Sequence, residues 1–199
     1  MNYIAHLHIA DITETSYAGS LLGDFKWQID PSHLALYKGW QLHQAVDTFV
    51  DAHPITERFK GLPRAGRRRF AGIIQDIVMD YWLVCYWERF STDSFELFSH
   101  RVVASLGQDK HLCPERLQKM ISSLEERNWL AGLGTKEGVE RAIRSIQKRW
   151  SLGRFLDPFI GELDLLIEQA KQPFLLLYPE VLENACAAAA ALDTGQVKK

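Results

Sequence analysis

The stretch WQLHQAVDTFVDAHP, residues 40–54, carries His43, Asp47 and Asp51 at intervals of four residues. On an α-helix, residues four apart lie on nearly the same face, one turn above another. The apolar residues of this stretch form a neighbouring stripe, so the three polar side chains would lie at its edge, beside the protein core. Aspartate is a poor helix former compared with the Lys, Glu and Gln typical of solvated helix faces. The spacing therefore indicates a chemical role rather than helix stability.

A second pair of carboxylates lies in the segment FAGIIQDIVMDYWLVCYW, which is apolar nearly all the way round a helix. Asp76 and Asp80 are again four residues apart. A buried carboxylate without a partner costs several kcal/mol or becomes protonated, and two on one face also repel each other. Either an arginine from elsewhere in the chain or a divalent cation could neutralise them, and the cation would neutralise both at once.

The first residues add further candidate ligands. His6 and His8 lie in AHLH, and Asp24 follows a glycine in LLGDF. A single histidine on an apolar face is more often a core residue than a ligand, but here several such groups precede residue 81, and the rest of the chain has only His100 and His111. Mixed imidazole and carboxylate ligands suit Mn²⁺, Fe²⁺, Zn²⁺ or Mg²⁺. No cysteine is placed to join them, which disfavours a structural zinc site.

The elements that must position these groups are helices. Apolar residues recur with helical period along almost the whole chain, and no segment of six or more residues alternates convincingly with period two. Period, prolines and capping signals predict helices over residues 3–10, 16–25, 32–52, 63–90, 94–106, 114–130, 136–149, 157–171 and 180–192. Pro54 is expected to close the third of these, and Pro173 and Pro179 to interrupt the chain before the last. We expect one all-α domain, residues 1–199, folded as a compact helical bundle with a frayed tail over 193–199.

The bulk composition narrows the class of protein. Of the 199 residues 47% are hydrophobic and 24% charged, which is typical of a globular chain with a substantial core. The net charge of −2 provides no overall basic field for nucleic acid. Three cysteines without CxxC spacing favour a reducing compartment. With neither a signal-peptide pattern nor about 18 consecutive apolar residues, we expect a cytoplasmic protein without a membrane span.

Four blocks of the sequence resemble the signature blocks of the bacterial acyl carrier protein phosphodiesterases: MNYIAHLHIA, GSLLGDF, LHQAVDTFVDAHP and QDIVMDYWLVCYW. The resemblance runs in order from residue 1 to about residue 90, and more loosely to the YPEVLENA segment. It implies a divergent version of the metal-dependent HD phosphohydrolase fold. It also implies hydrolysis of the phosphodiester that joins 4′-phosphopantetheine to a serine of acyl carrier protein, with a divalent metal, most often Mn²⁺; Mg²⁺ and Fe²⁺ are alternatives. The sequence departs from a plain HD pattern because it has no adjacent His-Asp pair: His43 and Asp47 are four residues apart.

This chemistry assigns roles to the candidate residues. A bound divalent metal polarises the phosphoryl group and lowers the pKa of its water. The expected metal ligands, all before residue 90, are Asp24, His43, Asp47 and Asp80. Asp76 and Asp51 are expected to support the ligands or to act as the base, and His6 or His8 to protonate the leaving serine oxygen. Two alternatives stay open: Asp51 could simply end its helix, and His8 could be a packing residue.

Acyl carrier proteins are acidic, so an enzyme that binds one is expected to have a basic surface near its active site. The run ERFKGLPRAGRRRF supplies four candidate partner-binding residues at the entry to the helix of Asp76: Arg64, Arg67, Arg68 and Arg69. A basic cluster at a helix start is unfavourable to the helix dipole, so helix stability does not explain it. The alternative is a solvated basic turn. Nucleic acid is disfavoured as the partner because the run lacks interleaved aromatic residues for base stacking.

Two other functions compete with this hypothesis. The first is an HD-type phosphohydrolase acting on a nucleotide or another small phosphate ester. The second is a helical interaction module without enzymatic activity, in which arginines pair with the carboxylates.

Overall fold

The computed structural model describes residues 1–25, 27, 29–64 and 68–194, and every regular element in these ranges is a helix. The α-helices are α1 (Tyr3–Ile12), α2 (Tyr17–Leu22), α3 (Leu34–Ala52), α4 (Pro54–Lys60), α5 (Arg68–Cys85), α6 (Phe95–Asp109), α7 (Glu115–Arg127), α8 (Lys136–Arg149), α9 (Asp157–Ile160) and α10 (Leu163–Asp193). Short 3₁₀ turns cover Gly23–Phe25, Trp87–Arg89, Lys110–Leu112, Trp129–Gly134 and Gly153–Leu156. The predicted all-α class is confirmed.

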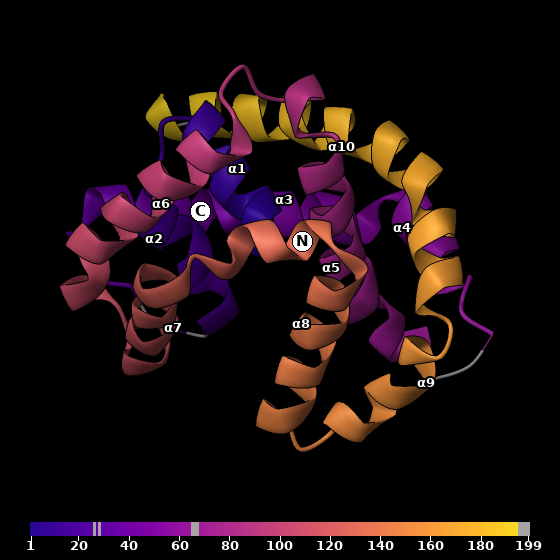
Figure 1. The fold of residues 1–199 in the computed structure, drawn as a ribbon. Coiled ribbons are helices and arrows are strands. Elements are labelled where there is room, and N and C mark those ends of the chain that lie inside the picture. Colours follow the sequence, from indigo (N-terminus) through magenta and orange to yellow (C-terminus); the bar gives the residue numbers. More distant parts are fainter. Residues whose placement is uncertain (26, 28, 65–67, 195–199) are drawn as a thin grey trace.

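The helices surround α1, which contacts α2, α5 and α10 (Figure 1). Helix α3 packs between α2 and α10, and α10 arches over the top and one side of the molecule. Helices α7 and α8 extend downward in the same view, with a space between them. One buried apolar cluster runs from Met1 to Ala189 and draws residues from almost every helix. The first turns of α1 therefore lie inside the core, as do His43 of α3 and Asp80 of α5, whereas Asp47 is partly exposed.

Helices α2 and α3 approach closely because each has a glycine at the contact. A Cβ on Gly19 would lie 2.5 Å from the Leu36 carbonyl oxygen, and one on Gly39 would lie 2.8 Å from that of Ser16. Both distances are shorter than side-chain carbon atoms tolerate, so larger residues would push the helices apart. The approach carries the turn after α2 onto the side of α3 that bears His43.

The prediction that the third helix closes at Pro54 is confirmed, because α3 ends at Ala52 and His53 is its C-cap. Pro54 is also the first residue of α4, a helix that we did not predict, and His53 is its N-cap and accepts a hydrogen bond from the Ile55 N–H at 3.2 Å. Proline suits a first turn because its missing N–H would have no helical partner there. Helix α5 is also shorter than predicted: Pro63 precedes it without belonging to it, and it begins at Arg68 and ends at Cys85.

The prolines near the C-terminus do not separate two helices as predicted. Pro173 and Pro179 both lie inside α10, which also extends through Asp193, a residue assigned to the frayed tail; residues 195–199 lie outside the described part. Proline removes one backbone hydrogen bond and bends a helix, and α10 is visibly curved (Figure 1). Buried residues on its inner side, among them Phe174 and Tyr178, hold it against the core. Packing along the whole length thus outweighs the local cost.

Helix α10 is also the one described helix whose length and composition would suffice to cross a membrane. Core helices of soluble proteins meet the same criterion, and α10 contacts α1, α3, α4 and α5.

Candidate functional site

Two histidines and one aspartate come together where the first half of α1 lies beside α3. His6 lies on α1, and His43 and Asp47 lie one turn apart on α3. His6 Nε2 is 3.2 Å from Asp47 Oδ1, and His43 Nε2 is 3.1 Å from Asp47 Oδ2. The three ligand atoms lie within 4.8 Å of one another, and both histidines are buried. This is a possible site for a divalent metal, and it brings together two residues predicted as ligands and one predicted as an acid.

His43 is oriented as a metal-binding histidine would be. Its Nδ1–H donates a hydrogen bond of 2.7 Å to the Ser20 carbonyl oxygen of α2, so its Nε2 faces Asp47. Histidine ligands are commonly held in this way by a second hydrogen bond from the other ring nitrogen. Burial acts to lower the pKa of His43, but the hydrogen bond to Asp47 and the charges of Asp47 and Asp24 outweigh burial and raise it. The site therefore attracts positive charge at this nitrogen.

His6 carries an unused acceptor atom in the core. Its Nε2 is fully buried and, although close to Asp47, is not aligned for a hydrogen bond. Burial lowers the pKa of His6 to about 3, so the ring is neutral at physiological pH. The two imidazoles stack with their centroids 3.9 Å apart. A neutral, buried nitrogen beside a carboxylate suits a metal ligand better than the proton donor that we predicted.

A glycine makes room for the His43 ring. A Cβ on Gly23, in the turn after α2, would overlap the imidazole at Cδ2 and Nε2. Gly23 is followed by Asp24, whose side chain is exposed and whose charge acts on both His43 and the Met1 ammonium. The structure thus places the predicted ligand Asp24 on the solvent side of the site.

We expect Gly23→Ala to reduce activity about 10- to 100-fold, the range found when groups that orient metal ligands are lost. The added methyl group must displace His43 from the position set by Ser20. Steady-state rates on the substrate proposed below would measure the effect. Gly72→Ala is the matched control, because a Cβ there meets only the Lys60 side chain at 3.5 Å. Equal rates for both variants would contradict the assigned position of His43.

The Met1 ammonium also lies at this site. It is 2.9 Å from Asp47 Oδ1 and 3.5 Å from Asp76 Oδ1. Burial alone would lower its pKa, but Asp76 and Asp47 outweigh burial and raise it to about 11. Asp76 keeps 38% of its side chain exposed, and its pKa is raised to about 6 by partial burial and by the neighbouring carboxylates. Asp47 and Asp76 are therefore both close to the same positive charge, that of the Met1 ammonium.

Asp80 has a different position from the one that we predicted for a metal ligand. It is fully buried, and its two oxygens accept hydrogen bonds from the backbone N–H groups of Ile4 and Ala5 at 2.9 and 3.0 Å. These N–H groups belong to the first turn of α1, where a helix has no internal acceptors and a partial positive charge. Burial nevertheless raises the pKa of Asp80 to about 7. Asp80 thus fixes the start of α1 and, through it, the position of His6.

The remaining two predicted catalytic residues lie apart from this group. His8 is buried on another side of α1, where its Nδ1 is 2.7 Å from the Tyr178 hydroxyl and its ring packs against Trp87. Asp51 is 79% exposed and lies 3.6 Å from the Lys60 ammonium. These positions agree with the two alternatives left open above, a packing histidine and a helix-ending aspartate.

The predicted partner-binding arginines that the structure describes lie at or before the start of α5. Arg68 pairs with Glu57 at 2.7 Å, and the Arg64 backbone N–H donates to Glu162 at 2.9 Å. The Arg69 guanidinium lies over the Phe70 ring, and Arg67 lies outside the described residues. Acidic residues therefore accompany this turn.

The donor set fits a divalent metal. Imidazole nitrogens of two buried histidines meet the carboxylate of the partly exposed Asp47, and one of the nitrogens has no hydrogen bond. Within the described ranges, the ion pairs of Asp47 and Asp76 are with histidines and the Met1 ammonium, not with arginines. This argues against the hypothesis of an interaction module whose carboxylates are neutralised by arginine.

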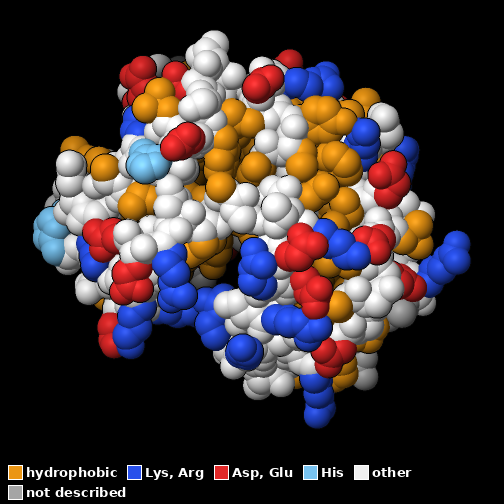
Figure 2. Space-filling model, viewed as in Figure 1, with side chains coloured by type: hydrophobic (Ala, Val, Ile, Leu, Met, Phe, Trp, Pro, Cys, Tyr) orange, Lys and Arg blue, Asp and Glu red, His pale blue; other side chains and the backbone are white. Residues whose placement is uncertain are grey.

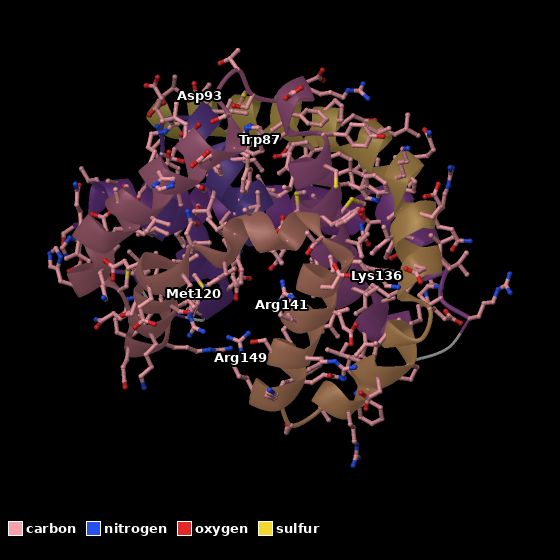
Figure 3. All side chains as sticks on the ribbon, viewed as in Figure 1. Trp87, Asp93, Met120, Lys136, Arg141 and Arg149 are labelled. Carbon is pink, nitrogen blue, oxygen red and sulfur yellow. The ribbon has the colours of Figure 1, made fainter. Side chains whose placement is uncertain are left out.

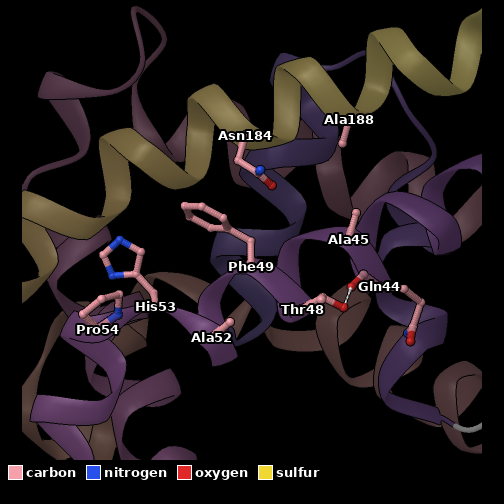
Figure 4. A pocket seen from close by; sticks show the side chains of 9 residues that line it. All are labelled: Gln44, Ala45, Thr48, Phe49, Ala52, His53, Pro54, Asn184 and Ala188. Atoms are coloured by element: carbon pink, nitrogen blue, oxygen red, sulfur yellow. Dashed lines mark hydrogen bonds between the residues drawn. The ribbon is translucent and has the colours of Figure 1, made fainter. Parts of the chain in front are cut away.

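A groove between α3 and α10 lies on a different side of α3 (Figure 4). It is lined mainly by apolar and amide side chains such as Phe49, Ala188 and Asn184. Its titratable lining residue, His53, is 3.2 Å from Glu180. The groove lacks the cluster of ligands found beside α1.

Comparison with known proteins identifies the family. The family model described as "Acyl carrier protein phosphodiesterase" matches residues 1–181. The acyl carrier protein phosphodiesterase of Photorhabdus laumondii is 26% identical over 188 residues, covering 93% of this chain and 95% of that protein. Those of Salmonella dublin and Yersinia enterocolitica are 26% and 25% identical over 191 residues, covering 93% of this chain and 97% of each relative. No solved structure matches, so the HD-like character of the fold stays a prediction. Because the family model matches residues 1–181 of 199, including α1, α3 and α5, the chain belongs to the acyl carrier protein phosphodiesterase family.

Proposed function

We propose that this protein is a hydrolase that cleaves the phosphodiester between 4′-phosphopantetheine and the serine of holo acyl carrier protein. The products are apo acyl carrier protein and 4′-phosphopantetheine. Family membership supports the reaction, and the convergence of His6, His43 and Asp47 is the structural observation that carries it. We place the enzyme in the cytoplasm, where its three free cysteines would stay reduced.

We infer that His6, His43 and Asp47 hold one divalent metal, with Asp24 as a further ligand. Mn²⁺ is the proposed ion, with Mg²⁺ or Fe²⁺ as alternatives, because imidazole nitrogen is a better ligand for Mn²⁺ and Fe²⁺ than for Mg²⁺. When bound, the metal supplies positive charge for the phosphoryl oxygens and lowers the pKa of water.

The other side chains have distinct proposed roles. Asp76 is half-buried, lies beside the ligand group, and has a pKa near 6, so its carboxylate can accept a proton from the attacking water. Asp80 positions His6 by holding the first turn of α1. We assign His8 to packing and Asp51 to the end of α3, and we propose no chemical step for either.

Mass spectrometry of holo acyl carrier protein tests this function directly. Incubation with the enzyme should remove the prosthetic group in one mass step, because hydrolysis releases it whole. Prior treatment with a chelator should abolish the reaction, and Mn²⁺ should restore it. A holo protein of unchanged mass after incubation with each of the three metals would contradict the proposal. If a small phosphodiester or a nucleotide is cleaved under the same conditions, the alternative phosphohydrolase function would be favoured.

A further inference from the structure

A second cavity, of about 770 Å³, opens between α7 and α8. In the space-filling view it is a hollow around which lysine and arginine side chains gather (Figure 2). Its walls include apolar side chains from α5, α7, α8 and the turn between α7 and α8: Ile77, Met120, Trp129, Leu133 and Ile146. Met120 of α7 and Arg141 and Arg149 of α8 lie at the space between the two helices (Figure 3). We call this cavity the α7–α8 cleft.

The α7–α8 cleft is strongly basic. Five of its lining residues are cations, and none is an aspartate or glutamate: Arg116, Lys119, Arg127, Arg141 and Arg149. Lys119 pairs with Glu115 at 2.6 Å. In the described part of the chain, no carboxylate lies within ion-pair distance of the four arginines. Because the whole chain has a net charge of −2, this local excess of positive charge does not simply reflect the overall composition.

The cleft adjoins the candidate metal site. Asn2 and Tyr3 line it and directly follow Met1, whose ammonium contacts Asp47 and Asp76. Ile77 lines it too and is the neighbour of Asp76 in α5. A molecule bound in the cleft would therefore lie beside the chain neighbours of Met1 and Asp76, on the α7 and α8 side of the site.

The lining indicates what kind of molecule would bind. Apolar walls suit an uncharged chain, and arginines without a carboxylate partner suit the carboxylates or phosphates of a ligand. Phosphopantetheine attached to an acidic protein combines these features, because its phosphate separates an uncharged amide chain from the protein. The turn before α5 fits less well, since Glu57 and Glu162 accompany its arginines.

We propose that the α7–α8 cleft is the docking site for the carrier protein. The apolar walls accommodate the phosphopantetheine arm, and the arginines of α7 and α8 contact acidic side chains around the modified serine. This inference rests on the proposed function, and it replaces the turn at Arg64–Arg69 as the principal docking surface.

Charge reversal on α8 tests the proposal. The cleft variant is Arg141→Glu with Arg149→Glu. The matched control is Arg144→Glu with Lys148→Glu, which makes the same change in net charge on the same helix at exposed residues that do not line the cleft. At low salt, the cleft variant should raise the KM for holo acyl carrier protein about tenfold or more, with kcat changed less than about twofold, because rim charges govern encounter and not the chemical step. The control should keep parental constants.

Three other results would overturn the docking proposal or separate it from the proposed function. Equal KM values for the cleft variant and the control would overturn the proposal and leave the proposed function intact. A larger KM increase for Arg64→Glu with Arg68→Glu than for the cleft variant would assign docking to the turn and also overturn it. If the parent enzyme does not cleave holo acyl carrier protein, the proposed function is wrong. Calorimetry would then measure whether holo acyl carrier protein still binds to the parent, the cleft variant and the control. Binding that is lost only in the cleft variant would support the cleft as a docking site, whereas equal binding to all three proteins, or no binding to the parent, would refute it.

Discussion

Asp47→Asn is expected to reduce hydrolysis of holo acyl carrier protein by more than about 100-fold, since even groups that only orient metal ligands contribute about 10- to 100-fold. Asp47 is the side chain that both histidines and the Met1 ammonium approach. Burial acts to raise its pKa, but the hydrogen bond from His43, the adjacent His6 ring and the Met1 ammonium charge hold the pKa well below the usual range. The carboxylate is therefore ionised at neutral pH, and asparagine removes the negative charge that a cation would need.

Initial rates by mass spectrometry would measure this loss, and circular dichroism would show whether the helices persist. Asp51→Asn makes the same change one turn later on α3, at an exposed residue, and its rate should stay close to that of the parent enzyme. Mn²⁺ should raise the melting temperature of the parent protein, because an ion that binds only the folded state stabilises it, and this rise should vanish in Asp47→Asn. An Asp47→Asn enzyme with near-parental turnover would exclude this residue as a ligand.

Asp80→Ala is expected to have the largest effect on stability, a loss of about 3 kcal/mol or more. Each buried N–H group left without an acceptor costs about 1–3 kcal/mol, and this variant leaves two of them, on Ile4 and Ala5. Urea denaturation in the presence of a chelator would measure the change without a contribution from metal. Asp76→Ala is the matched comparison, one turn earlier on α5 and half exposed, and it should cost less than about 1 kcal/mol. Equal losses would show that the hydrogen bonds to α1 contribute little.

The same residue gives a pH dependence with a defined sign. Because the pKa of Asp80 rises to about 7 in the folded protein, the folded state holds its proton more tightly than the unfolded state does. Its contribution to stability is fully present below about pH 4, the ordinary range of aspartate, and is lost as pH rises toward 7. Asp80→Asn cannot titrate, so the stability difference between parent and variant should shrink over that interval. A difference that grows with pH would contradict the assigned burial.

Several features of this protein could be predicted from local sequence. Helical period predicted the all-α class, because the side chains of a buried helix face recur every three to four residues whatever they pack against. The four-residue spacing of His43 and Asp47 placed them on one helix face for the same reason. The apolar surroundings of Asp80 predicted its burial, which is confirmed, but its partners are backbone N–H groups and not the arginine or cation that we considered.

The tertiary structure alone decided which partners these residues have. His6 joins His43 and Asp47 only because α1 packs against α2 and α5, and Asp80 accepts backbone N–H groups that no motif identifies. Which of these distant residues come into contact depends on how whole helix faces pack, and the local sequence around one side chain does not determine that packing. Similarly, the prolines of α10 predicted a break, but packing along its inner side keeps it continuous. The basic α7–α8 cleft is the clearest case, since its arginines are spread over residues 116–149 and form one surface only because two helices face each other.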